Sequence, residues 1–133
     1  MILVDTNILL RLVLNDNPTL SPKARIIFER ISSGEVDSLI TLLTISEVVY
    51  TLERSYKIPK REIVESLSKL FNILNLKVEK QKLIQRTFTI YVSKNISFPD
   101  SYHVAYMESK RLNQIYSFDT DFDKFPKIKR LEK

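Results

Sequence analysis

The sequence predicts an α/β fold, a three-layer α/β/α sandwich with a short parallel sheet of four to five strands. Short apolar stretches rich in β-branched residues recur along the chain, and segments with helical periodicity separate them. Such alternation of strands and helices is typical of a parallel sheet that helices cover on both faces. The 133 residues show no internal repeat, low-complexity segment or linker. We therefore expect a single domain over residues 1–133.

The expected strands are short, and turn residues or helix starts follow them. Ile2, Leu3 and Val4 form an apolar run that is too short and too branched for a helix, and we expect a fully buried strand there. Further strands are expected at residues 38–41, 74–78, 115–118 and 128–131. Helices are expected at residues 8–14, 22–32, from 42 to the Ile58-Pro59 pair, and at 60–72, 79–93 and 99–112. Residues 119–125 are expected to form a turn or a single helical turn.

Composition excludes several kinds of chemistry. The chain has no Cys, so disulfide scaffolds, zinc–thiolate sites and thiol nucleophiles are excluded together. One His, His103, cannot form a His-rich zinc site, and one Gly, Gly34, excludes a glycine-rich phosphate loop. The net charge of +5, from 21 Lys and Arg against 16 Asp and Glu, mildly favours a polyanionic partner.

The apolar runs of the chain are too short for a membrane span. Ile8–Leu10 and Leu12–Leu14 are among the longest, and charged residues interrupt them. Met1 leads directly into the first expected strand, which leaves no room for a signal peptide. Together with the absence of Cys, these features predict a cytoplasmic protein.

Four acidic residues lie where a ligand site of a parallel sheet is expected. Asp5 directly follows the first strand, and Asp119 follows the fourth. Glu47 interrupts the apolar helix after the second strand, and Asp100 lies at the start of a late helix. In open parallel sheets, ligands bind beyond the carboxyl ends of the strands, near the point where the strand order reverses. The four side chains are therefore candidates for one shared site.

Carboxylates gathered in one crevice need a cation. Two of them ~4 Å apart repel by about 4 kcal/mol at an effective dielectric constant of about 20, so four would not all ionise at neutral pH without a counter-charge. Because only oxygen ligands are available, the cation would be Mg²⁺ or Mn²⁺. Such a metal on a basic protein suits phosphodiester hydrolysis, where it activates a water molecule and stabilises charge on the phosphate.

The ordered set of motifs resembles a PIN domain. Its parts are Asp5-Thr6-Asn7 after the opening strand, Ser46-Glu47 in an early helix, Pro99-Asp100 at a late helix start, and the run from Ser117 to Phe122. In this order, and in a chain of this size, they resemble a VapC-type toxin ribonuclease of a toxin–antitoxin pair. The resemblance covers nearly the whole chain, from Ile2 to about Phe125.

The resemblance implies a small α/β/α sandwich that cleaves RNA endonucleolytically with Mg²⁺ or Mn²⁺ and a metal-bound water. It implies a catalytic, metal-binding cluster made of Asp5, Glu47, Asp100 and Asp119. It also implies supporting polar side chains: Asn7, which would orient Asp5 or the water, and the hydroxyls of Thr6 and Ser117. The implied partners are an RNA substrate, a small antitoxin that plugs the site, and a second copy of the chain.

Each acid also has a structural interpretation. Asp5 caps a helix, Asp100 interacts with a helix macrodipole, and Asp119 forms part of a turn. Glu47 faces solvent in that interpretation. Asp121 and Asp123 compete with Asp119 for the fourth role, and for Asp121 a cap or an ion pair is the main alternative to ligation.

Two basic clusters are candidates for contact with the RNA backbone. One contains Lys57, Lys60 and Arg61, and the other contains Lys127, Lys129 and Arg130. A solvated face is the simpler interpretation of both clusters. Arg11 is a separate candidate for phosphate contact, because it lies on the first helix beside Asp5.

Two other functions remain open at this level. One is an Mg²⁺-dependent aspartyl phosphohydrolase or phosphotransfer protein with Asp5 as the nucleophile. Such enzymes usually carry a second Asp two residues later, where this chain has Asn7. The other is a non-catalytic module that binds RNA or protein. The RNA target, the cleavage position, the number of metal ions and the oligomeric state are not encoded in any motif.

Overall fold

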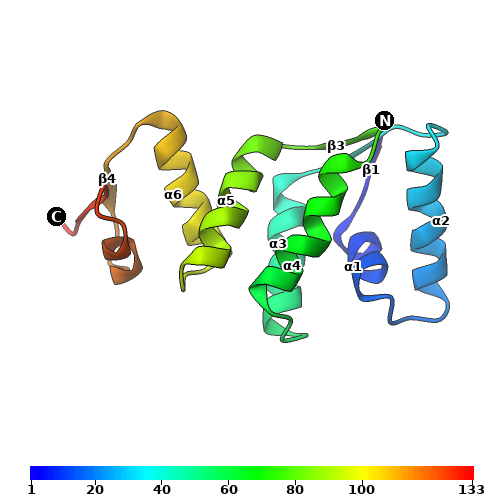
Figure 1. Ribbon diagram of the computed structural model, residues 1–133, viewed down its shortest axis with the longest axis horizontal. Coiled ribbons are helices and arrows are strands. Elements are labelled where there is room, and N and C mark those ends of the chain that lie inside the picture. Colours follow the sequence, from blue (N-terminus) through cyan, green and yellow to red (C-terminus); the bar gives the residue numbers. More distant parts are fainter. The chain divides into compact units, whose positions relative to one another are not determined.

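The computed structural model describes all 133 residues and divides into two compact units (Figure 1). The N-terminal unit comprises residues 1–81 and the C-terminal unit residues 82–133. Each contains helices and parallel strands, which confirms the predicted α/β class. The five strands lie in two sheets, three in the N-terminal unit and two in the C-terminal unit, and each unit is described by itself below.

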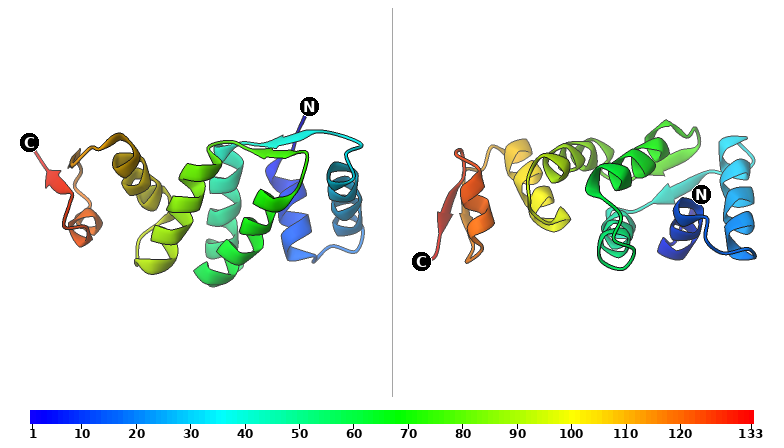
Figure 2. Two further views of the ribbon diagram at one scale, coloured as in Figure 1. Left: turned by 45° about the horizontal axis from the view of Figure 1, so that its top comes forward. Right: turned by 60° about the horizontal axis from the view of Figure 1, so that its bottom comes forward.

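The N-terminal unit is built on a parallel sheet in the order β1-β2-β3. Its strands are β1 (Ile2–Leu3), β2 (Ser38–Ile40) and β3 (Leu76–Val78). Its helices are α1 (Thr6–Leu14), α2 (Leu20–Ser32), α3 (Leu42–Arg54) and α4 (Lys60–Ser68), followed by the 3₁₀ helix η1 (Lys69–Asn72). Helices α1 and α2 lie side by side in both views of Figure 2.

Two helices of this unit begin directly after a strand. Asp5 is the N-cap of α1 and Thr41 the N-cap of α3; both have extended backbone conformations, and the side chain of each accepts a backbone N–H of its helix. Capping of this kind satisfies donors that a helix start would otherwise leave without partners. The starts of α1 and α3 therefore lie at the carboxyl ends of β1 and β2, which is the edge where the sequence places its first two acids.

The first strand is not fully buried, contrary to the expectation for Ile2, Leu3 and Val4. Val4 is buried, but Ile2 is 56% and Leu3 62% exposed. The reason is topological: β1 is an edge strand that pairs within its sheet only with β2. The sequence pattern identifies the strand but cannot show that its second neighbour is missing from the same sheet.

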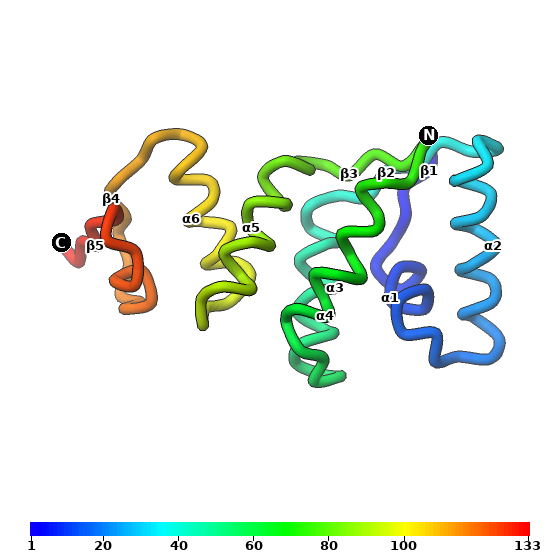
Figure 3. Tube along the Cα trace, viewed as in Figure 1, coloured from blue at the N-terminus to red at the C-terminus, as the bar shows by residue number.

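The C-terminal unit contains two long helices and a two-stranded parallel sheet. Its elements are α5 (Gln81–Ser93), α6 (Phe98–Lys110), β4 (Gln114–Tyr116), the 3₁₀ helix η2 (Thr120–Lys124) and β5 (Lys129–Leu131). Figure 3 traces the chain from α6 through β4 and η2 to β5. A core of Ile90, Ile96, Val104, Ala105 and Phe122 joins the two helices to η2.

Sequence patterns located every element, with end positions shifted by a few residues. The helix expected at 60–72 is divided into α4 and η1, and the segment expected at 119–125 as a turn or helical turn is η2. Gly34 lies just beyond α2 with φ of 85°, a conformation that suits glycine at a helix end. No helix in the structure combines the length and apolar character needed to cross a membrane.

Two isoleucines of α2 test how the N-terminal unit is held together. Ile31 is fully buried, whereas Ile26 is 55% exposed. We expect Ile31→Ala to lower the free energy of unfolding by about 2–5 kcal/mol through lost burial and cavity formation. The matched Ile26→Ala change should stay within about 0.5 kcal/mol. Urea titrations measure both values, and equal losses would contradict this description of the core.

Candidate metal centre

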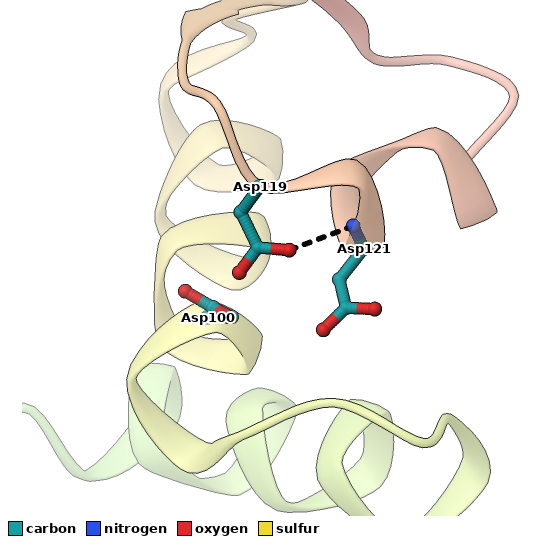
Figure 4. Close-up of side chains that lie close together, drawn as sticks. All are labelled: Asp100, Asp119 and Asp121. Carbon is teal, nitrogen blue, oxygen red and sulfur yellow. Dashed lines mark hydrogen bonds between the residues drawn. The ribbon is translucent and has the colours of Figure 1, made fainter.

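Three carboxylates of the C-terminal unit converge on one point. One oxygen each from Asp100, Asp119 and Asp121 lies within 4.8 Å of the others (Figure 4). Asp100 comes from the first turn of α6, and the other two come from the start of η2. Asp119 is exposed, and Asp100 and Asp121 are half-buried. The structure therefore brings together two predicted site residues and the residue that the sequence offered as a possible additional acid.

The start of α6 places Asp100. Ser97 is the N-cap, and its Oγ accepts the backbone N–H of Asp100 at 3.2 Å. Pro99 in the first turn has a φ that suits a helix start. Behind this turn the Phe98 ring packs against Phe88 and Tyr91, with ring centroids 5.9 and 6.0 Å away. The Asp100 carboxylate is thus attached to a rigid, packed helix end.

A short chain of hydrogen bonds places Asp119 and Asp121. Ser117 Oγ accepts the backbone N–H of Asp119 at 3.0 Å, and Asp119 Oδ1 accepts the backbone N–H of Asp121 at 2.9 Å (Figure 4). Asp119 is therefore the N-cap of η2, as its turn interpretation suggested. A carboxylate has about four lone-pair sites, so this bond is compatible with metal ligation.

Burial and like charge oppose ionisation in this cluster. Burial raises the pKa of Asp100 above its ordinary value, and repulsion from Asp119 raises it further, although Ser97 and His103 act in the opposite direction. A divalent cation would remove both penalties. The donor set contains carboxylate oxygens only, which fits a hard ion such as Mg²⁺ or Mn²⁺ and does not fit zinc in its usual nitrogen and sulfur sites.

The structure distinguishes Asp121 from Asp123, the two alternatives to Asp119 as the fourth acid of the predicted metal site. Asp121 lies in the cluster, where it also forms an ion pair with Lys124 at 3.0 Å. Asp123 instead binds the guanidinium of Arg130. Sequence spacing alone could not distinguish these residues, because the direction of each side chain depends on the 3₁₀ geometry of η2.

The N-terminal unit holds the other two predicted acids. Asp5 Oδ1 accepts the backbone N–H of Thr6 at 2.8 Å, and Thr6 Oγ1 donates to Glu47 Oε2 at 2.5 Å. Thr6 therefore links the start of α1 to Glu47 on α3. Glu47 is exposed, although it interrupts an apolar stretch of α3. Asn7 follows in the first turn of α1 and is also exposed.

The predicted RNA-binding residues differ in how firmly they are held. Arg11 donates to Asp16 at 2.8 Å and to the Tyr56 hydroxyl at 3.4 Å, so part of its hydrogen-bonding capacity is already used. Lys57 and Arg61 are exposed near the start of α4, and Lys60 is its first residue. These three residues follow the C-terminal end of α3, whereas Glu47 lies in the first half of that helix.

The chain belongs to the PIN domain family, whose model matches residues 2–128 and so spans both units. Two curated relatives are 31% identical to it over 137 residues, covering 98% of this chain and 99% of each relative. They are the VapC ribonuclease Mb1869c of Mycobacterium bovis and the ribonuclease VapC13 of Mycobacterium tuberculosis.

Two solved structures are similar at a lower level. One is VapC20 of Mycobacterium tuberculosis, a toxin that cleaves the sarcin–ricin loop, at 18% identity and a TM-score of 0.42, covering 95% of both chains. The other is a toxin–antitoxin complex from Klebsiella pneumoniae, at 18% identity and a TM-score of 0.35, covering 97% of this chain and 96% of that one.

Two acids of α6 should affect stability in opposite directions. Asp100→Asn should raise the melting temperature of the metal-free protein at neutral pH, because the raised pKa of Asp100 means that its ionised form disfavours folding. The increase in melting temperature should be complete at pH values above the raised pKa of Asp100. It should disappear as the pH falls to the ordinary pKa of an aspartate. Thermal unfolding in EDTA across a pH series measures it.

Glu108→Gln is the matched control. The hydrogen bond and charge of Arg86 lower the pKa of Glu108, so its carboxylate stabilises the fold above the ordinary glutamate pKa. Removing it should lower the melting temperature at neutral pH, and the loss should vanish as the pH falls through the lowered pKa. A lower melting temperature for Asp100→Asn at neutral pH would contradict the account of the cluster.

Proposed function

We propose that this protein is a metal-dependent endoribonuclease in which Asp5, Glu47, Asp100 and Asp119 hold one Mg²⁺ or Mn²⁺ site. The observation that carries the proposal is the convergence of three carboxylate oxygens in a chain of the PIN domain family. The names of the two 31% identical relatives support ribonuclease activity, and the oxygen-only donor set supports the choice of metal. Asp121 is a further ligand in this proposal.

We propose that residues 1–133 form a single PIN domain. The family model supports this, because it matches residues 2–128 and so includes all four acids.

The four acids occupy similar positions within their own units. Asp5 follows β1 and Asp119 follows β4, and ligands of open parallel sheets bind beyond the carboxyl ends of the strands. In the N-terminal unit Thr6 links the Asp5 turn to Glu47, and in the C-terminal unit Asp100 lies with Asp119 in the acidic cluster.

Each residue would then have its own role in phosphodiester hydrolysis. A bound Mg²⁺ or Mn²⁺ would supply Lewis acidity and a lower pKa for the attacking water. The four carboxylates would fix the metal's position, while Thr6 and Ser117 hold Glu47 and Asp119 in place. Asn7 would orient Asp5 or the water. Lys57, Lys60 and Arg61, with the remaining donors of Arg11, would bind the RNA backbone.

The toxin role is part of the same proposal. It includes a small antitoxin protein that plugs the site, a homodimer and action in the cytoplasm. The names of the two 31% identical relatives, both VapC ribonucleases, support the toxin role.

Substitution of single acids tests the site. Mutation of a residue that hydrogen-bonds to a metal ligand typically lowers metal affinity or activity by about 10–100-fold. Loss of a ligand itself should therefore lower activity by at least about 100-fold. We expect Asp5→Asn, Glu47→Gln and Asp119→Asn each to lose RNA cleavage to that extent while the circular dichroism spectrum is unchanged. Gel assays on labelled RNA with Mn²⁺, and with EDTA as the blank, measure this.

Asp37→Asn is the matched control, because Asp37 is exposed and precedes β2, at the opposite end of the sheet from Asp5. It should cleave like the wild type. Wild-type cleavage by Asp5→Asn would refute the site. Wild-type protein that binds Mn²⁺ and RNA but cleaves neither structured nor unstructured RNA would indicate a non-catalytic binding module.

The basic residues should affect binding and leave the chemical step unchanged. We expect Lys57→Ala and Arg61→Ala each to weaken RNA binding and to reduce the salt dependence of log K by about 0.7, the value for one phosphate contact on a single strand. The rate at saturating RNA should be unchanged. Lys23→Ala, at an exposed position on α2, is the control. Salt slopes identical to wild type would exclude this surface from the RNA path.

A further inference from the structure

We propose that Arg130 is a positioning residue that holds the segment carrying Asp119 and Asp121 in its metal-binding conformation. The inference rests on the proposed function, since it assigns a role in the same site. It concerns the C-terminal unit alone. It also replaces the hypothesis that Arg130 belongs to a basic surface for RNA.

The Arg130 side chain is only 14% exposed and is bound on several sides. Its Nε donates to Asp123 Oδ1 at 3.1 Å and its Nη2 to Asp123 Oδ2 at 3.3 Å, so the pair is bidentate. Its Nη1 donates to the backbone carbonyl of Ser117 at 3.1 Å and to Glu132 Oε1 at 2.5 Å. We call Arg130, Ser117 and Asp123 the Arg130 clamp.

The clamp holds both ends of the acidic segment. Ser117 lies two residues before Asp119, and Asp123 lies two residues after Asp121. A single planar guanidinium therefore fixes the distance between the two ends, because its donors have a rigid fork geometry. Arg130 itself is fixed on β5, where it lies opposite Ile115 of β4.

Hydrogen bonds continue from the clamp to the carboxylates. Ser117 N–H donates to the Leu131 carbonyl at 3.0 Å, so β5 holds Ser117 from two sides. Ser117 Oγ accepts the N–H of Asp119, and Asp119 Oδ1 accepts the N–H of Asp121. Loss of the Arg130 guanidinium would therefore affect both ligands, because it frees Ser117, which fixes Asp119, which in turn fixes Asp121.

Apolar packing supports this segment at one end. Phe122 is 3% exposed and belongs to the core, but Phe118 is 84% exposed and Asp119 and Thr120 are exposed beside it. The part that carries Asp119 therefore depends mainly on polar bonds for its conformation. Because the carboxylates repel one another, a segment without the clamp would move Asp119 away from Asp100.

The test compares Arg130→Met with Arg86→Met. Arg86 forms a similar bidentate pair with Glu108, at 2.8 and 3.0 Å, that joins α5 to α6 and includes no residue of the segment. Both changes should lower the melting temperature. Arg130→Met alone should weaken Mn²⁺ binding, measured by calorimetry, by about 10–100-fold. Cleavage by Arg130→Met should recover at saturating Mn²⁺, and Arg130→Lys should be intermediate.

Amide hydrogen exchange gives a readout that does not require activity. The Asp119 and Asp121 N–H groups should exchange faster in Arg130→Met, and at wild-type rates in Arg86→Met. A folded Arg130→Met protein with wild-type exchange at both amides and wild-type Mn²⁺ affinity would overturn the proposal. Wild-type protein that binds no Mn²⁺ would instead refute the metal site, and the exchange rates would still decide whether the clamp orders the segment.

Discussion

Electrostatic repulsion among carboxylates is the constraint on which the candidate site depends. Asp100, Asp119 and Asp121 lie within 4.8 Å of one another although their charges oppose this arrangement. Proximity of this kind persists only where the backbone is fixed by other bonds or where a cation compensates the charge. Local bonds provide the first condition: Ser97 fixes the backbone at Asp100, and Ser117 does so at Asp119.

Helix capping by an aspartate that follows a strand occurs in both units. Asp5 and Asp119 each follow a strand, and each accepts a backbone N–H at the start of the next helix. Capping aims a carboxylate at the helix N-terminus, where the macrodipole favours negative charge. The structural and the metal-binding interpretations of these acids are therefore compatible, because one oxygen caps the helix while the group retains further lone pairs for a ligand.

The sequence predicts those parts of the site that depend on local geometry. The positions of Asp5, Asp100 and Asp119 at strand ends or helix starts follow from apolar runs and capping residues, which are short-range signals. The separation of Asp121 from Asp123 was not predictable, because it depends on the 3₁₀ turn and on Arg130. The exposure of Ile2 and Leu3 was missed because strand patterns do not specify neighbours. The single domain over residues 1–133 remains a prediction.

Mn²⁺-induced paramagnetic broadening of the amide spectrum tests most directly whether Asp5, Glu47, Asp100 and Asp119 hold one metal ion. The effect is confined to nuclei near the ion. The proposal predicts that substoichiometric Mn²⁺ broadens Thr6 and Asn7 in the N-terminal unit together with Asp119 and Thr120 in the C-terminal unit, at the same metal concentration. Broadening of the C-terminal amides alone, with those of Thr6 and Asn7 unchanged at saturation, would contradict it.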